Sequence, residues 1–304
     1  MNNEQPTPDM QPTDEHPIIV IEHDDDDTMT GKAPKPHHRH RMQQYALTAL
    51  FLAIILIAAF AGYRSWGYFY RIGVPISVTP EENIEKLTAP LKHEEAQVIA
   101  THDSVLGVAL DLFEIHGMNA TLQFEEPDTA DTSVYLYARS ADHHPNGEYE
   151  GSLVVAGEEK QSDRSRLGYM AMVNGRMVIG ISRSDKVKDY VAKRGGSFFR
   201  QYILVSDGKL PGRFHLHGKV ERRAIGRMGE QLYYIVTPHK ETLWDFADAL
   251  REYGFTDAIY ITGGNDYGYY RSRDGQRHDI LPDSLYPHKK WAGIVPWLVF
   301  RARH

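Results

Sequence analysis

The stretch Thr242–Gly264, TLWDFADALREYGFTDAIYITGG, predicts the centre of the fold. A helix predicted from about Lys240 to Tyr253 has apolar side chains one helical turn apart, the spacing of a helix that buries one face. These positions are Leu243, Phe246, Ala247 and Leu250. Gly254 follows the last turn, and a left-handed glycine ends many helices. The stretch therefore predicts an amphipathic helix that stops at Gly254.

A buried strand and a pair of glycines follow this helix. Ala258 to Ile261 form an apolar run, and Gly263 and Gly264 come directly after Thr262. In sheets built from helix–strand units, ligands bind beyond the carboxyl ends of the strands. The glycine pair is therefore a candidate pocket floor.

Strand patterns dominate the chain from about His102 onward. Apolar residues alternate with polar ones, or run continuously, in segments such as Val108–Ile115, Ser133–Arg139 and Tyr169–Val173. One further short helix is expected after Ser184, which is a capping residue type. Many strands with few helices predict an α+β domain built around a mixed β-sheet.

Composition excludes several functional classes. The chain has 304 residues, a net charge of −7 and no cysteine. Disulfides, thiolate metal sites and cysteine nucleophiles are therefore excluded. The acidic balance argues against nucleic acid as a partner, because such proteins present a basic surface. No metal site and no cofactor are predicted.

An apolar run near the N-terminus predicts one membrane span. Residues 45–62 carry no charge, and a run of roughly 20 apolar residues crosses a bilayer as a helix. A buried core helix would show a polar face, and a signal peptide would begin near the N-terminus. Basic residues are more numerous before the run than after it, so we expect the N-terminus inside. The C-terminal part is then periplasmic or extracellular.

The span divides the chain into four predicted parts. Residues 1–42 are expected to be a disordered cytoplasmic tail, because they hold too little apolar surface to order themselves. Residues 43–66 form the transmembrane helix, 67–101 a stalk and 102–304 the exported domain. Within the tail, the apolar patch Ile18–Ile21 is a candidate docking segment for a cytoplasmic partner.

Two other segments are, like the glycine pair, candidates for binding a ligand. Asn174-Gly175 is a glycine turn that follows the apolar strand Tyr169–Val173. Arg223 precedes Ala224 and Ile225, and an arginine can hold phosphate oxygens through two hydrogen bonds. Glycine turns let a ligand approach the backbone and can direct N–H groups at an anion. A glycine pair after a strand is usually an ordinary turn, and the pair Gly263-Gly264 gains weight as a site from the second turn at Asn174-Gly175.

The order of these segments resembles the phosphodiester glycosidase domain family, which includes the uncovering enzyme of lysosomal mannose-phosphate tagging. The resemblance runs from about Leu106 to Asp274. The segments that carry it are Asn174–Met177 at the family's Asn-Gly-Gly-Phe turn, Tyr202–Leu210 (YILVSDGKL) at its Val-Ser-Asp/Asn-Gly-Lys hairpin, Arg223–Gly226 at its Arg-x-Ala-Ile-Gly segment, the helix Thr242–Gly254, and Thr262–Asp266 at its terminal Asp-Gly-Gly-Gly-Ser. The resemblance implies a hydrolase that acts on a sugar-1-phosphodiester.

The chain departs from the family's pattern at the site itself. Thr262 stands where the family has an acid, and Arg176 stands where its first turn has a second glycine. Hydrolysis at an anomeric carbon commonly uses two carboxylates. Asp266 is then the nearest candidate acid, with Glu241 from the start of the helix. The residues expected to bind substrate are Asn174, Gly175, Arg223, Thr262, Gly263, Gly264 and Asn265.

Two functions remain open on this basis. One is a membrane-anchored, exported hydrolase that cleaves a sugar-1-phosphodiester of the cell envelope. The other, suggested by the uncharged Thr262, is a catalytically inactive module that binds a glycan or another protein. A scaffold whose tail recruits a partner is a third, weaker hypothesis.

Overall fold

The computed structural model describes residues 37–70, 78–144, 146–212, 218–264, 267–281 and 293–303. The chain divides into two compact units, Met1–Ala58 and Ala59–His304. Residues 1–36 of the predicted disordered tail, with its docking patch Ile18–Ile21, lie outside the described residues, whereas residues 37–42 of that tail are helical. Asn265 and Asp266 lie outside the described residues as well.

The long helix α1 (His37–Tyr70) contains the apolar run. Among the described residues it is the one helix long and apolar enough to cross a membrane, over Met42–Tyr63. Its large apolar side chains, such as Leu56 and Ile57, are exposed. The helix thus fits the predicted span in length and composition, while its orientation in a membrane stays a prediction.

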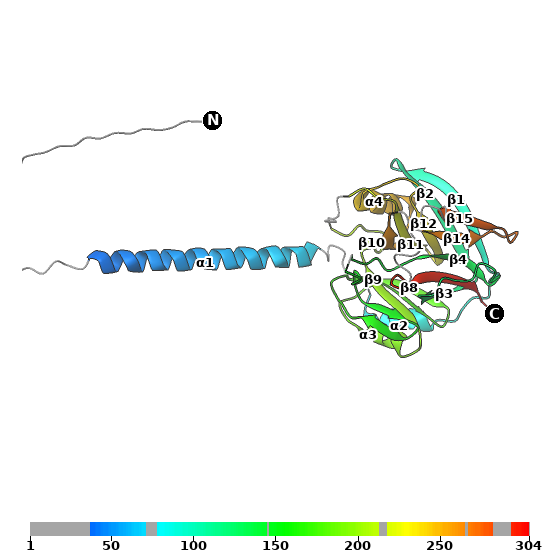
Figure 1. Cartoon of the computed structure of the whole chain (residues 1–304), viewed down its shortest axis with the longest axis horizontal. Coiled ribbons are helices and arrows are strands. Elements are labelled where there is room, and N and C mark those ends of the chain that lie inside the picture. Colours follow the sequence, from blue (N-terminus) through cyan, green and yellow to red (C-terminus); the bar gives the residue numbers. More distant parts are fainter. Residues whose placement is uncertain are drawn as a thin grey trace, which may run out of the picture. The chain divides into compact units, whose positions relative to one another are not determined.

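A six-stranded sheet forms one side of the domain (Figure 1). In spatial order its strands are β1 (Gln97–Val105), β2 (Val108–His116), β12 (Gln231–Val236), β11 (Arg222–Met228), β13 (Asp257–Gly263) and β10 (Ile203–Val205). Helix α4 (Leu243–Tyr253) packs on its outer face. The helix stripe predicted from the sequence is confirmed, since Leu243, Phe246 and Leu250 are fully buried there.

The end of α4 at Gly254 forms as predicted, whereas its first residue, Leu243, lies after the predicted start at about Lys240. The Thr242 hydroxyl accepts a hydrogen bond from the Asp245 N–H at 3.0 Å, and Gly254 takes the left-handed conformation with φ of 110°. The helix connects β12 to β13, and these two strands flank β11 on either side. Because β11 is antiparallel to both, β12 and β13 run in the same direction without being neighbours. The predicted helix–strand unit therefore exists inside an antiparallel ladder.

The remaining strands form two five-stranded sheets. One contains β15 (Arg277–Leu281), β14 (Gly268–Arg271), β4 (Val134–Arg139), β16 (Trp297–Ala302) and β3 (Met118–Gln123) in spatial order. The other contains β6 (Glu158–Gln161), β5 (Leu153–Val155), β9 (Ser197–Gln201), β7 (Gly168–Val173) and β8 (Arg176–Ile181). Side chains from all three sheets, among them Ile225, Leu298 and Met170, share one central hydrophobic core. The α+β class with few helices is confirmed.

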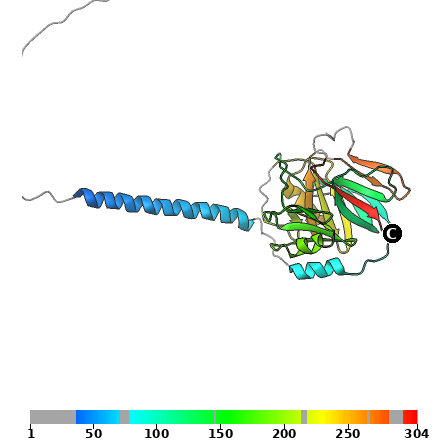
Figure 2. The ribbon, with the colours of Figure 1, turned by 60° about the horizontal axis from the view of Figure 1, so that its bottom comes forward.

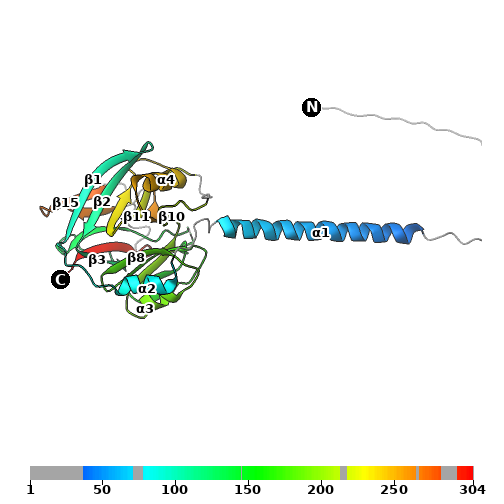
Figure 3. The same ribbon diagram turned by 180° about the vertical axis from the view of Figure 1, so that it is seen from behind.

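Two short helices cover the outer face of the third sheet (Figures 1 and 2). They are α2 (Pro80–Thr88) and α3 (Lys186–Ala192). Leu87 of α2 and Val191 of α3 lie in one apolar cluster with Tyr169 of β7. Seen from behind, α2 and α3 lie at the opposite end of the domain from α4 (Figure 3).

The folded domain begins earlier than the predicted boundary at residue 102. Residues 80–101, assigned to a stalk from the sequence, contain α2 and the first half of β1. A capping box starts α2, because Thr79 and Glu82 exchange hydrogen bonds between side chain and backbone. Leu87 is 2% exposed. This buried face makes α2 part of the core rather than of a linker.

Candidate functional site

A small irregular hairpin brings two carboxylates face to face. It lies between β4 and β5, where His143 forms an antiparallel bridge with Tyr149. The next pair outward is Asp142 and Glu150, whose backbones are joined by a hydrogen bond from the Glu150 N–H to the Asp142 carbonyl at 3.0 Å. Directly opposed residues have Cβ atoms about 4.5–5.5 Å apart, with side chains on the same face. Two acidic side chains are thus held together by main-chain geometry.

These carboxylates line a cavity of about 320 Å³. The cavity is lined by Asp142, Glu150, Tyr202, Gly218, Val220, Arg222, Tyr260, Gly263 and Gly264. It lies at the carboxyl end of β13 and the start of β11. The small hairpin is attached to the same place, because the Asp142 N–H donates to the carbonyl of Ile261 in β13 at 3.2 Å. A volume of this size is within the range of small-ligand sites.

Burial sets the protonation of Asp142. Removal of the carboxyl from water, together with the nearby charge of Glu150, raises its pKa from 3.8 to about 6. The backbone N–H of His143 and the guanidinium of Arg222 oppose this rise. Asp142 therefore holds its proton to a higher pH than an ordinary aspartate.

Glu150 lies in a different electrostatic setting. One carboxylate oxygen contacts the Arg166 guanidinium, and the other lies 3.3 Å from His144 Nε2. The side chains of Arg166 and Glu150 are 10% and 17% exposed, so this ion pair is mostly screened from water. A neighbouring cation favours the charged form of a carboxyl group. The hairpin thus presents one acid inclined to keep its proton and one paired with an arginine.

Arg222 faces the two carboxylates from the start of β11. Its Nε donates to the Glu241 carbonyl at 2.9 Å, Nη1 to the Tyr260 hydroxyl at 3.3 Å and Nη2 to the Gly218 carbonyl at 2.6 Å. These contacts fix the plane of the guanidinium. Burial raises the pKa of Tyr260 to about 12, so this phenol stays protonated at neutral pH.

Gly263 and Gly264 shape the cavity because they carry no side chain. A Cβ on Gly263 would lie 2.3 Å from the Tyr260 hydroxyl oxygen, so only glycine leaves the phenol in place. Gly264 has φ of +80°. Its N–H donates to the Glu221 carbonyl at 2.9 Å and its carbonyl accepts from Arg223 Nη1 at 2.7 Å. The expectation that the N–H of Gly264 points at an anion is therefore wrong, because that donor is used within the fold.

The structure brings together part of the predicted site. Gly263 and Gly264 line the cavity, while Arg223 is 1% exposed and lies behind Gly264. Thr262 is 7% exposed and belongs to β13. Glu241 supplies its carbonyl to Arg222 and pairs through its backbone with Val220. Its carboxylate is not among the groups that line the cavity.

The turn Asn174-Gly175 lies elsewhere in the domain. It joins β7 to β8, and both its residues have positive φ, as a two-residue hairpin turn requires. Around it are Asn119, Leu91 and Arg303, none of which lines the cavity. The opposite end of β7, at Gly168, is the end that packs near the cavity, against Gln201 and Ile203.

Sequence analysis did not single out Asp142 and Glu150. Their signal is the segment Asp142–Glu150, DHHPNGEYE, in which Asn146-Gly147 is a strong hairpin-turn dipeptide with an acid placed on either side. Whether these two acids lie opposite each other depends on the register of the backbone pairing. Only the fold shows that they meet Arg222, which is distant in sequence.

Among the described residues, no three histidine, aspartate or glutamate side chains gather closely enough to hold a metal ion. No protein-family profile and no curated protein matches the sequence. Among solved structures, the chain is similar to the catalytic domain of zebrafish N-acetylglucosamine-1-phosphodiester alpha-N-acetylglucosaminidase, auto-inhibited by its pro-peptide. That match has a TM-score of 0.49 and 13% identity, and covers 71% of this chain and 85% of the other. A hypothetical protein from Synechocystis gives a TM-score of 0.47 and 9% identity over 70% of this chain and 64% of the other. These likenesses concern the fold alone.

Proposed function

We propose that the cavity hydrolyses the glycosidic bond of a sugar phosphodiester. The observation that carries the proposal is the pair Asp142 and Glu150, opposed on one hairpin beside Arg222 in a cavity. Like charges placed opposite each other destabilise a sheet. A pair with that cost, facing a hollow at the end of a core strand, is better explained by chemistry than by packing.

The two carboxyl groups have complementary roles in this reaction. Glu150, charged beside Arg166, accepts a proton from a water molecule whose oxygen attacks the anomeric carbon. Asp142 gives its proton to the leaving phosphate oxygen as the carbon–oxygen bond breaks. The products are a free sugar and a phosphate monoester, with one water consumed. One acid and one base of this kind are the usual pair for glycoside hydrolysis.

Arg222 and Tyr260 are suited to the phosphate of such a substrate. A guanidinium has five N–H donors, and three of those of Arg222 serve the protein contacts described above. The contacts with the described residues leave two for an anionic ligand, in a plane already fixed by the fold. The protonated Tyr260 hydroxyl can donate one more hydrogen bond.

The family resemblance predicts two other carboxylates, those of Asp266 and Glu241. Asp266 follows Gly264 by two residues in the sequence, lies outside the described residues and stays a predicted acid. Glu241 is proposed to act through its carbonyl, by orienting Arg222. The span Met42–Tyr63 is proposed to hold the domain at a membrane, with the N-terminus cytoplasmic.

The test is turnover by the full-length protein in detergent with a panel of glycosyl-1-phosphodiesters. General acid–base groups contribute about 10²- to 10⁴-fold, so Asp142→Asn and Glu150→Gln are each expected to lower kcat/KM by that factor. Glu148→Gln, on the exposed side of the same hairpin, is the matched control and should retain activity. No turnover with any substrate of the panel would contradict the enzymatic proposal.

A catalytically inactive binding module is the second candidate. Hydrogen-bond donors beside the cavity are used within the protein, which favours this function. The N–H of Gly264 and the guanidinium of Arg222 both donate to backbone carbonyls. Saturable binding of the same phosphodiesters without product, lost in Arg222→Met, would support this function instead.

A further inference from the structure

Arg166 is the cation nearest to Glu150, and it is held on two sides. Its Nη2 contacts Glu150 Oε2, and its guanidinium carbon lies 4.2 Å from the centre of the Tyr202 ring. Tyr202 and Glu150 both line the cavity, whereas Arg166 lies behind them. An arginine stacked on an aromatic face loses little further freedom when it pairs with a carboxylate.

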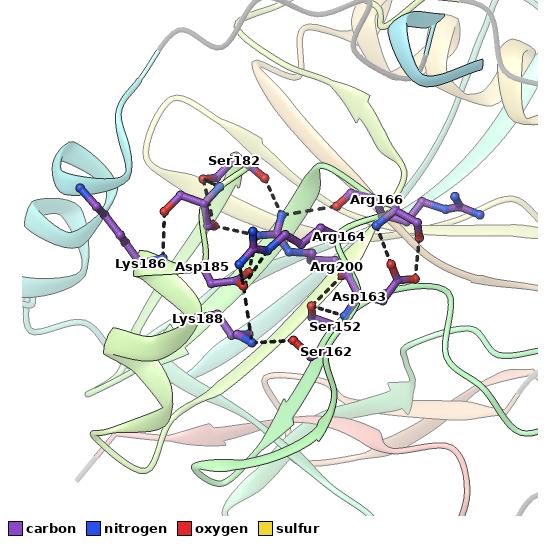
Figure 4. Close-up of polar contacts among 12 residues, drawn as sticks. Ser152, Ser162, Asp163, Arg164, Arg166, Ser182, Asp185, Lys186, Lys188 and Arg200 are labelled. Atoms are coloured by element: carbon purple, nitrogen blue, oxygen red, sulfur yellow. Dashed lines mark hydrogen bonds and ion pairs between the residues drawn. The ribbon is translucent and has the colours of Figure 1, made fainter. Parts of the chain in front are cut away.

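A second, buried arginine, Arg200, lies next to Arg166 and holds its backbone (Figure 4). Arg200 donates through Nη1 to the carbonyls of Ser182 at 2.5 Å and Arg166 at 3.4 Å, and it pairs with Asp185 at 3.3 Å. Its side chain is fully buried. The Cβ of Arg200 also packs so closely on Gly151 that an added Cβ there would lie 2.8 Å away. Arg200 thus fixes the backbone of Arg166 and of the residue after Glu150.

The backbone on both sides of Glu150 is held by Gln161. The Gln161 amide donates to the carbonyls of Tyr149 at 2.7 Å and Gly151 at 3.1 Å, and accepts from the Tyr149 N–H at 2.8 Å. Glu150 therefore has a fixed main chain, and the direction of its carboxylate is decided by the partners of its side chain. Those partners are Arg166 and, at the rim, the half-exposed His144.

We propose that Arg166 is the positioning residue that holds the Glu150 carboxylate in one direction at the cavity, so that Glu150 and Asp142 have different roles. The inference rests on the proposed acid–base function of this pair. The charged and titratable groups that face the two carboxyls are Arg166, His144, Arg222 and Tyr260. Of these, Arg222 faces Asp142, while Arg166 contacts Glu150 directly. Without Arg166 the Glu150 carboxylate would lose the contact that fixes its direction.

The first readout is independent of turnover. Full-length protein labelled with ¹³C at the glutamate carboxyl carbons is observed by NMR at pH 7, and the Glu150 signal is identified by its loss in Glu150→Gln. In Arg166→Met this signal is expected to change its chemical shift and to broaden, because the carboxylate is no longer held in one direction by its arginine partner. Arg166→Lys keeps the charge and should restore most of the difference. An unchanged Glu150 signal in Arg166→Met overturns the proposal.

The second readout is kinetic. In Arg166→Met we expect kcat to fall at least tenfold with KM changed less than twofold. Arg166→Lys, which cannot form the same planar contact, should recover only part of kcat. Arg164→Gln is the matched control, because Arg164 lies in the same loop and pairs with Asp185, away from the cavity. A uniform loss in all three variants would overturn the specific role.

The two readouts separate this inference from the proposed function. A changed Glu150 signal in Arg166→Met without turnover by the wild type would leave the positioning role of Arg166 intact and remove the hydrolase. Turnover with an unchanged Glu150 signal would do the reverse. If Arg166→Met does not fold, Tyr202→Leu removes the ring beneath the guanidinium. It should then change the Glu150 signal by a smaller amount, and no change would overturn the inference.

Discussion

Two glycine turns that look alike in the sequence have different surroundings in the fold. Each follows an apolar strand, Gly263-Gly264 after β13 and Asn174-Gly175 after β7. The first lines a cavity with two carboxylates and an arginine. The second is a tight hairpin turn packed on Asn119 and held by Arg303.

The difference comes from what the rest of the chain brings to each turn. At Gly263-Gly264, the loop between β4 and β5 attaches to β13 and delivers Asp142 and Glu150. At Asn174-Gly175, the approach of the segment before β1, through Leu91, fills the space instead. A glycine turn is thus a site only where other segments leave it open and add charge.

The largest expected effect concerns the stability of the cavity end as a function of pH. Asp142 has a folded-state pKa of about 6 against 3.8 when unfolded, so its ionisation opposes folding. Stability contributed by the neutral form is present below pH 4 and is lost as pH rises through 6, by about 3 kcal/mol. Asp142→Asn should remove this loss. Urea unfolding at pH 4 and pH 7 measures it, with Asp128→Asn at an exposed turn as control. An equal pH dependence in the wild type and Asp142→Asn would contradict the burial argument.

The next effect separates the two turns directly. Gly175 has φ of +73° and an added Cβ would lie 2.4 Å from Asn119 Oδ1, so Gly175→Ala should lower the unfolding free energy by roughly 1–3 kcal/mol. Activity per folded molecule should stay the same. Gly263→Ala should instead displace the Tyr260 hydroxyl and reduce kcat/KM about tenfold or more, by the loss of one positioned donor.

Thermal unfolding and turnover on both alanine variants test this pair of outcomes. If Gly175→Ala reduced activity as strongly as Gly263→Ala, the turn at Asn174-Gly175 would belong to the site after all.

The smallest expected effect tests the structural role of the turn Asn174-Gly175. Arg303 donates to the carbonyls of Met118 and Gly175 and to the Asn119 side chain. Arg303→Met should therefore lower the unfolding free energy by about 1 kcal/mol, the net worth of a typical lost hydrogen bond. Chemical denaturation gives the value, and kcat/KM should match the wild type. A selective loss of activity would indicate that this arginine acts on a ligand.

The elements with strong local signals could be predicted. Helix α4 ends at Gly254 as expected, because cap chemistry and apolar spacing act within a few residues, whereas its N-cap is Thr242 rather than a residue near Lys240. Helix α2 was missed although Thr79 and Glu82 form a capping box, since its short length gives a weak pattern. At α3 the cap position is Asp185 rather than Ser184, and the Asp185 carboxylate serves Arg164 and Arg200 instead of the helix.

The candidate site was only half predictable. Gly263 and Gly264 were found, because a glycine pair after a buried strand is visible in the sequence. Asp142, Glu150 and Arg166 were not, because their meaning depends on contacts between segments far apart along the chain.

The sequence by itself determined the apolar helix Met42–Tyr63, the α+β class and the unit of α4 with β13, since each follows from periodicity and composition over a short window. Tertiary structure alone decided which polar groups share the cavity. Backbone pairing sets the register of Asp142 against Glu150. The packing of β7, β9 and β11 brings Arg166, Tyr202 and Arg222, which lie at or near the ends of these strands, around them. Such contacts arise from the burial of three sheets in one core, a long-range effect that no short window of sequence contains.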